Sequence, residues 1–296
     1  MKSKRVLILG ATGMLGHTLF SELARKDDLE VHGTARSMGG VEGAFPKKVL
    51  ENITPGVDAQ NFDTIIGAVA SAQPDIVINC VGLIKQAPLA KDPFSAITVN
   101  AQLPHRISLV CKTAGARMIH FSTDCAFDGK KGGYTEQDPS DAKDLYGRTK
   151  YLGEVKYPHC VTLRTSIIGH ELKGKRALLE WFLSQDRGVK GFRKAIYTGF
   201  PTVEMARIIH EYVLSHPQLT GLYHVSSEPI SKYDLLKLIA EKYGKQIEIQ
   251  PYDEFYCDRS LDSTLFRKKT GYVPPSWSTL VDKMHRHYLA SGIYNQ

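Results

Sequence analysis

The amino-acid sequence predicts an α/β protein with a doubly wound parallel sheet and a smaller C-terminal α/β lobe. Three observations support this prediction. Continuous runs of valine, isoleucine and leucine alternate with helical patterns over the first half, as in parallel sheets that are covered on both faces. A glycine-rich turn joins the first of these runs to the first helical pattern. After Gly169 the rhythm changes to helical patterns separated by short strands.

The first half contains strands and helices in alternation, the order of a Rossmann fold. Strands are expected at the apolar runs 5–10, 29–36, 75–82, 116–123 and 160–169. Helices are expected at 14–26, 61–73, 92–115 and around 145–154. We therefore expect a first domain over residues 1–166.

The second half predicts a smaller lobe over residues 167–296, with parts of 195–226 returning to the first domain. Its helical patterns lie at 177–185, 202–216, 232–244 and 274–292, and its short strands at 221–227 and 246–252. No repeat or flexible linker separates the two parts. Two lobes packed as one unit leave a cleft between them, where small ligands commonly bind.

The composition is that of a globular protein, with 42% hydrophobic and 23% charged residues among 296. Apolar runs fall short of the roughly 18 residues that a membrane helix needs, and the N-terminus lacks a signal-peptide cleavage pattern. Five scattered cysteines without a C-x-x-C pair favour reduced thiols over disulfides or a zinc site. We expect a cytoplasmic protein with no membrane partner and no metal.

The net charge of +7 and the pI of about 9.0 favour an anionic partner. Basic clusters occur at 2–5, 173–176 and 267–269. None is interleaved with aromatic residues, as a nucleic-acid platform would be. The charge therefore suits an anionic small molecule, and we expect no nucleic-acid partner.

The glycine-rich turn has the spacing of a dinucleotide-binding loop. Gly10 permits the tight turn, Gly13 lets the backbone approach a pyrophosphate, and Gly16 lets helix and strand pack closely. The N-terminus of the helix that follows supplies N–H donors and partial positive charge for phosphates. The expected cofactor loop comprises Gly10, Thr12, Gly13, Met14, Leu15 and Gly16.

The end of the second strand favours NADP(H) over NAD(H). An NAD site usually places a carboxylate there for the ribose hydroxyls. This chain has Arg36 and Ser37 instead, and an arginine binds a 2′-phosphate in a two-pronged fork, whereas a carboxylate would repel it.

Two further motifs carry chemical groups. Ser122, Thr123 and Asp124 follow an apolar strand at the end where ligands bind in open α/β sheets. Tyr146 and Lys150 are four residues apart in a helical pattern and therefore share one helix face. By itself each motif also fits a structural role: capping of a turn for the first, a solvated surface pair for the second.

Taken in order, these motifs resemble the extended short-chain dehydrogenase/reductase family. Within that family the chain most resembles the nucleotide-sugar 4-ketoreductases, of which dTDP-4-dehydrorhamnose reductase is typical. The resemblance covers nearly the whole chain and rests on the segments "GATGMLG", "FSTDCAFDG", "YTEQDPSDAKDLYGRTKYLGE", "LRTS", "GFPTVEMA", "GLYHVSS" and "DRSLDSTLFRKKTGY".

The resemblance implies roles for particular residues. The catalytic set would be Thr123, Tyr146, Lys150 and Asn100, the last supporting the lysine. Beyond the glycine loop, the cofactor would contact Arg36, Ser37, Asp58, Cys80, Val81, Gly82 and Lys150. The substrate, bound by the C-terminal lobe, would contact Lys85, Gln86, Thr123, Asp124, Tyr146 and Arg259.

The implied reaction is reduction of the 4-keto group of a nucleotide-linked 4-keto-6-deoxyhexose by NADPH, for surface polysaccharide. A tyrosine has an ordinary pKa near 10, and Lys150 together with an oxidised nicotinamide is expected to lower it. Tyr146 would then donate the proton to the developing alkoxide, and Thr123 would hydrogen-bond the same oxygen.

Other functions stay open at the level of sequence. Related dehydratases carry a glutamate where this chain has Cys125, which argues against a dehydratase. An epimerase on a similar substrate and a non-catalytic NADP-binding regulatory subunit remain alternatives. The stretch that contains Lys85 and Gln86 differs from the rhamnose enzymes, so the sugar is open. A homodimer through helices 92–114 and 141–156 is one arrangement that relatives suggest.

Overall fold

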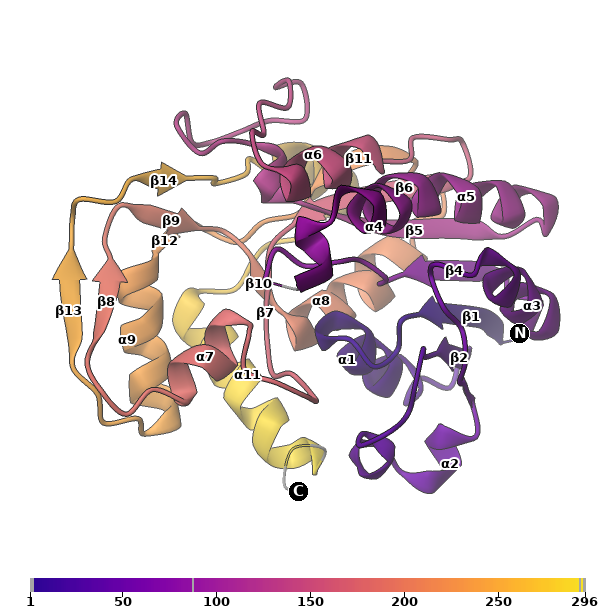
Figure 1. The fold of residues 1–296 in the computed structure, drawn as a ribbon, viewed down its shortest axis with the longest axis horizontal. Coiled ribbons are helices and arrows are strands. Elements are labelled where there is room, and N and C mark those ends of the chain that lie inside the picture. The colour runs from indigo at the N-terminus through magenta and orange to yellow at the C-terminus, as the bar shows by residue number, and fades with distance from the viewer. Residues whose placement is uncertain (1–2, 87, 293, 295–296) are drawn as a thin grey trace.

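The computed structural model describes residues 3–86, 88–292 and 294. Within them, a seven-stranded parallel sheet forms the centre of the molecule (Figure 1). Its strands in spatial order are β11 (Gly221–His224), β6 (Cys160–Thr165), β5 (Arg117–Thr123), β4 (Ile76–Asn79), β1 (Lys4–Leu9), β2 (Leu29–Thr34) and β3 (Ile53–Thr54). Every neighbouring pair runs parallel. This confirms the predicted α/β class and doubly wound sheet.

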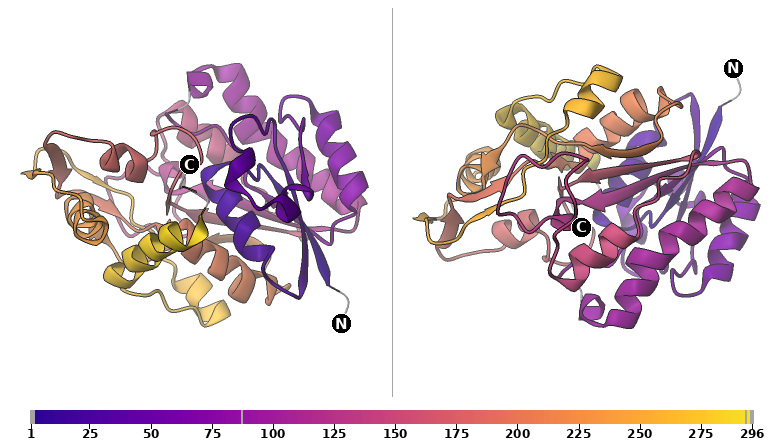
Figure 2. Two further views of the ribbon diagram at one scale, coloured as in Figure 1. Left: turned by 90° about the horizontal axis from the view of Figure 1, so that it is seen from below. Right: turned by 90° about the horizontal axis from the view of Figure 1, so that it is seen from above.

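Helices cover both faces of the sheet (Figure 2) because successive side chains of each strand point to opposite faces. In β1, Val6 and Ile8 pack in one core with α1 (Met14–Leu23) and α8 (Thr202–Ile208). Leu7 and Leu9 pack in a second core with α3 (Phe62–Ala72) and α5 (Leu103–Thr113). The apolar runs of the sequence are continuous for this reason.

The predicted helix at 92–115 is continuous but mixed in type. It comprises α4 (Pro93–Ala96), the π-helical segment η3 (Ile97–Gln102) and α5. Asp92 caps its start, since its carboxylate accepts a 2.9 Å hydrogen bond from the Ser95 N–H, and Pro93 at the first turn has no N–H to satisfy. A π-helical turn often marks a functional position, and Asn100 lies in this one.

Shorter elements connect the strands. They are η1 (Glu42–Ala44), α2 (Lys47–Leu50), η2 (Pro88–Lys91), η4 (Asp124–Ala126) and α6 (Leu145–Leu152), and α8 continues into the π-helical η5 (Ile209–Leu214). The sequence did not predict η1, α2 or β3, because each spans only two to four residues. The observed α6 is also shorter than expected, since Gly153 ends it.

The smaller C-terminal sheets lie beside the large sheet (Figure 1). The strand pairs are β7 (Ile167–Ile168) with β10 (Phe200–Pro201), β8 (Val189–Phe192) with β13 (Ile249–Tyr252), and β9 (Ala195–Tyr197) with both β12 (Ile230–Ser231) and β14 (Cys257–Asp258). The helices are α7 (Leu178–Leu183), α9 (Lys232–Tyr243), α10 (Thr264–Thr270) and α11 (Trp277–Ser291). Because α8 packs on α1 and β11 joins the large sheet, we propose the division at 166/167 with parts of 195–226 returning to the first domain.

Candidate active site

The carboxyl ends of the central strands bring the predicted motifs together. Residues aligned in register include Leu9 with Asn79, and Thr123 with Thr165. The glycine loop after β1, the segment after β4 and the end of β5 therefore open onto the same edge of the sheet. Ligands of doubly wound folds bind at this edge.

The glycine loop has the geometry that its spacing predicts. Gly10 has φ +81°, a left-handed conformation that favours glycine. A Cβ on Gly16 would lie 2.1 Å from the Gly10 carbonyl oxygen, so only glycine permits this approach of helix to strand. Gly13 is the N-cap of α1 and no side chain caps the helix, which leaves its first turn available to a phosphate.

A cavity of about 280 Å³ lies beside this loop. Its lining includes eight residues of the expected cofactor set: Gly10, Thr12, Gly13, Arg36, Asp58, Cys80, Val81 and Gly82. The glycine cradle, which a Cβ would fill, and the cationic Arg36 at the cavity fit an adenine dinucleotide. Leu15 instead packs in the hydrophobic core, and Ser37 is exposed in the loop after β2.

Thr123, Tyr146 and Lys150 come together where α6 crosses the end of β5. Asp144 caps α6, accepting a 2.9 Å hydrogen bond from the Gly147 N–H. A Cβ on Gly147 would lie 2.2 Å from the Cys125 carbonyl oxygen, so this glycine allows the helix to lie against the turn that follows Thr123. A hydrogen bond then links Tyr146 with Thr123.

The protein's own groups raise the pKa of Tyr146, whereas the lowering expected from sequence invoked Lys150 together with an oxidised nicotinamide. Burial is the largest cause and the neighbouring Cys125 adds to it, while the hydrogen bond with Thr123 opposes both. Burial removes water from the charged phenolate, and the hydrogen bond with Thr123 does not compensate for this loss of hydration. Burial also lowers the pKa of Lys150 to about 8, against the opposing influence of Glu154.

Lys150 and Asn100 stabilise the backbone around the site. The Lys150 ammonium donates a 2.7 Å hydrogen bond to the Phe121 carbonyl oxygen. The amide of buried Asn100 accepts from the Leu83 N–H at 2.9 Å and donates to the Leu83 carbonyl at 3.1 Å. Asn100 thus holds the segment after β4 in place and leaves Lys150 to bond β5.

A buried ion pair beneath α6 was not predicted from the sequence. Glu154 and Arg164 form two hydrogen bonds, Nε to Oε1 at 2.6 Å and NH2 to Oε2 at 2.8 Å, with both side chains 2% exposed. Ser122 donates to the same carboxylate at 2.8 Å, and His224 contacts the guanidinium at 3.2 Å. Glu154 lies just past Gly153, which ends α6, and Arg164 lies in β6, so no spacing in the sequence connects them.

Three of the four polar residues that we expected at the substrate, beyond Thr123 and Tyr146, have contacts near the start of α6. Lys85 forms a 3.0 Å ion pair with the capping Asp144. Arg259 donates to the Phe127 carbonyl oxygen at 2.7 Å, and Asp124 accepts from Thr123 at 3.2 Å. Gln86 is exposed in the segment that follows Lys85.

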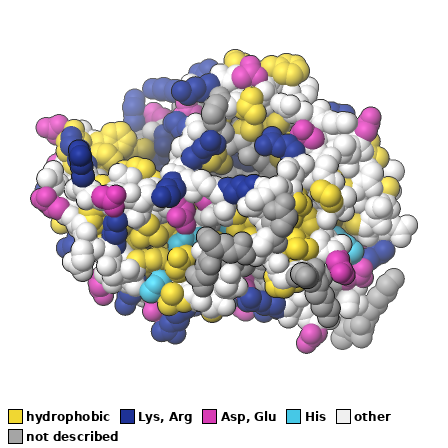
Figure 3. All heavy atoms as spheres, turned by 60° about the horizontal axis from the view of Figure 1, so that its bottom comes forward, with side chains coloured by type: hydrophobic (Ala, Val, Ile, Leu, Met, Phe, Trp, Pro, Cys, Tyr) yellow, Lys and Arg dark blue, Asp and Glu magenta, His cyan; other side chains and the backbone are white. Residues whose placement is uncertain are grey.

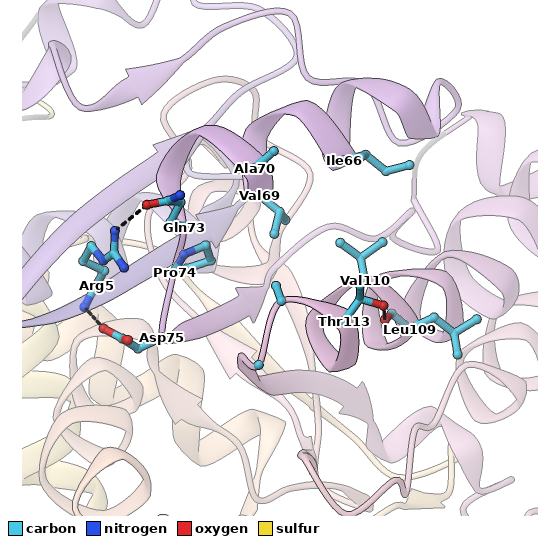
Figure 4. A pocket seen from close by; sticks show the side chains of 12 residues that line it. Arg5, Ile66, Val69, Ala70, Gln73, Pro74, Asp75, Leu109, Val110 and Thr113 are labelled. Carbon is cyan, nitrogen blue, oxygen red and sulfur yellow. Dashed lines mark hydrogen bonds between the residues drawn. The ribbon is translucent and has the colours of Figure 1, made fainter.

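A larger cavity, of about 820 Å³, lies between α3 and α5 at the opposite edge of the sheet (Figure 4). Arg5 donates hydrogen bonds to Asp75 through its backbone N–H and to Gln73 through its guanidinium, and the exposed Ile66 and Leu109 also line the cavity. It lies away from the strand ends where the candidate catalytic residues gather. Over the described ranges, no three His, Cys, Asp or Glu side chains are placed to hold a metal ion, and no helix is long and apolar enough to cross a membrane.

The fold and the arrangement of the site are those of the extended short-chain dehydrogenase/reductase class. More particularly, the chain belongs to the RmlD substrate binding domain family, whose model matches residues 4–289. This confirms the resemblance seen in the sequence.

Individual relatives have different names. Methionine adenosyltransferase 2 subunit beta of Danio rerio is 27% identical over 255 residues, which cover 81% of this chain and 74% of the relative. The spore coat polysaccharide biosynthesis protein SpsK of Bacillus subtilis is 29% identical, covering 83% and 81%. A dTDP-4-dehydrorhamnose reductase from Bacillus anthracis, solved with NADP, matches with a TM-score of 0.78 at 22% identity, covering 97% of this chain and 99% of that one. Solved structures of this fold hold NADP or NAD.

Proposed function

We propose that the protein reduces the 4-keto group of a nucleotide-diphosphate-linked 4-keto-6-deoxyhexose with NADPH, for surface-polysaccharide biosynthesis in the cytoplasm. The observation that carries the proposal is the meeting of Thr123, Tyr146 and Lys150 beside the glycine-loop cavity. The family and the name of the relative SpsK support the sugar-nucleotide class and the polysaccharide context. The sugar is dTDP-4-dehydrorhamnose or a similar compound, including a UDP-linked N-acetylated one.

The preference for NADPH rests on Arg36, an exposed cation at the cavity, where an NAD site would usually have a carboxylate. The residues that would hold the dinucleotide are the glycine loop, Arg36, Asp58 and the segment Cys80–Gly82. NADPH, when bound, would supply the hydride.

The residues of the chain would supply the proton and the orientation. Because the pKa of Tyr146 is raised, the phenol is protonated at neutral pH and is an acid ready to donate to a developing alkoxide. Thr123 would turn its hydroxyl from Asp124 to the same oxygen. Lys150, with a pKa of about 8, is mostly charged at pH 7 and would stabilise the tyrosinate that is left.

The test is NADPH oxidation with a panel of dTDP- and UDP-linked 4-keto-6-deoxysugars, with Tyr146→Phe as the matched variant. We expect stoichiometric NADPH loss on one member and a fall of at least about a hundredfold in kcat for the variant. Conversion of the sugar without net NADPH loss would identify the protein as an epimerase and contradict the proposed reductase. NADPH binding without turnover on any member would contradict the reductase for these substrates.

A second candidate is an NADP-binding subunit of another enzyme. The similarity to methionine adenosyltransferase 2 subunit beta over 255 residues favours it. In that case Tyr146→Phe would change neither cofactor binding nor the activity of the partner enzyme. The intact Thr123, Tyr146 and Lys150 arrangement favours the reductase instead.

A further inference from the structure

Two loops from opposite halves of the chain meet at Gly40, four residues after Arg36 in the sequence. One is the loop after β2, which includes Ser37 and Gly40, and the other is the loop from β7 to α7 (Figure 1). Gly40 has φ +71°, and a Cβ at this position would lie 3.1 Å from the Lys173 Nζ. The ammonium of Lys173 therefore lies against the loop that follows the cofactor-binding strand.

The two loops are anchored on the same core. Met38 and Leu172, which are next to Ser37 and Lys173 in the sequence, both pack against the core that contains α1 and α8. The Glu171 carboxylate accepts hydrogen bonds from the N–H groups of Arg176 and Ala177, each at 2.8 Å. These bonds close a compact turn that leaves Lys173 exposed on its outer side.

Three exposed charges of these two loops are positive, whereas the carboxylate of Glu171 is used by backbone N–H groups of its own turn. Arg36, Lys173 and Lys175 are exposed, and none of them forms a salt bridge with another described residue. The Ser37 hydroxyl accepts a 3.2 Å hydrogen bond from the Gly39 N–H, so its own proton is free for another acceptor. Figure 3 shows lysine and arginine side chains spread over the face that comes forward when the lower side of Figure 1 is turned toward the viewer, with acidic side chains among them. Positive charges without a counter-charge favour an anionic ligand between them.

We propose that Lys173, from the C-terminal half of the chain, completes with Arg36 and Ser37 a binding site for the 2′-phosphate of NADP(H). The guanidinium would supply a two-pronged contact, the ammonium a point charge and the serine a hydroxyl donor, which together match a phosphate dianion. The inference rests on the proposed cofactor. The loop 171–177 would then cover the adenosine end of the cofactor, and the 2′-phosphate of NADP(H), which NAD(H) lacks, would contact residues from both halves of the chain.

The first test compares the wild type with Lys173→Ala by titration calorimetry, using NADP⁺ and NAD⁺ in parallel. Lys175→Ala is the matched control, since it removes the same charge from the same turn but does not lie against Gly40. We expect Lys173→Ala to weaken NADP⁺ binding about tenfold, as for the loss of one charge-assisted contact, and to leave NAD⁺ binding unchanged. Lys175→Ala should bind NADP⁺ within about twofold of the wild type.

Equal losses in the two lysine variants would overturn the proposal, because they would reflect general attraction and not a site. The same holds if Lys173→Ala binds NADP⁺ as the wild type does, a result that leaves the proposed reductase intact. A wild type that binds neither nucleotide would overturn the cofactor and this inference together. A second measurement, hydrogen exchange, should show slower exchange in 171–177 with NADP⁺ than with NAD⁺, and equal exchange would contradict closure of the loop.

Discussion

The buried pair of Glu154 and Arg164 allows a sharp prediction about how the candidate active site is held. The perturbation is Glu154→Gln, which keeps the shape and the hydrogen bond to Ser122 but removes the negative charge. Arg164 is fully buried beneath α6 and stacks 5.1 Å from the Phe127 ring. Its guanidinium would remain in place without a counter-charge.

The expected loss of stability is large. Removing one member of a buried pair costs about 3–5 kcal/mol, because the remaining charge stays desolvated. At about 2 °C per kcal/mol for a chain of this size, the melting temperature should fall by about 6–10 °C. The pKa of Lys150 should fall below its value of about 8, because Glu154 is the main influence that raises it.

The assay is chemical denaturation at pH 7, together with a pH profile of kcat for NADPH oxidation. The control is Glu154→Gln combined with Arg164→Met, which removes both charges. It should recover most of the lost stability and remain about 1 kcal/mol below the wild type, because the contact of Arg164 with His224 is lost. In Glu154→Gln the basic limb of the pH profile should move to lower pH. If the single variant is as stable as the double variant, the pair does not hold α6 as described.

Further predictions concern Lys150, Gly16 and Gly153. Burial lowers the pKa of Lys150 from 10.5 to about 8, so the unfolded chain binds the proton more tightly, and the native state is penalised below pH 10.5 and fully so below pH 8. Lys150→Met should therefore abolish turnover yet raise the free energy of unfolding at pH 7 by about 2 kcal/mol, a value that already subtracts about 1 kcal/mol for the lost hydrogen bond to Phe121. In the same denaturation assay this gain should vanish above pH 10.5. Gly16→Ala should prevent NADP⁺ binding in a titration. Gly67→Ala, with open space around its Cβ, should bind NADP⁺ normally and have a free energy of unfolding about 0.5–1 kcal/mol higher than the wild type. Gly153→Ala should lower the melting temperature measurably, because its Cβ would lie 2.0 Å from the Asn100 carbonyl oxygen, and an unchanged value would show that α6 can shift.

Prediction from sequence succeeded where the chemistry is local. The spacing of Gly10, Gly13 and Gly16 encodes a backbone path, and the structure has that path. The apolar runs encode strands buried on both faces, and the parallel sheet contains them. The four-residue spacing of Tyr146 and Lys150 places both on one turn of α6. Each of these features depends on neighbours along the chain, whose geometry a short segment already determines.

The sequence by itself determined the class of fold, the path of the glycine-rich loop and the choice of candidate catalytic residues. Only the tertiary structure decided their electrostatics and support. The pKa of Tyr146 was expected to be lowered by Lys150 together with an oxidised nicotinamide, and the protein's own groups raise it, because burial depends on every element packed around the phenol. The pairing of Glu154 with Arg164 and the approach of Lys173 to Gly40 join segments that no periodicity connects. Such contacts exist only when the sheet and its helices are assembled, since desolvation and charge interaction depend on distance in space.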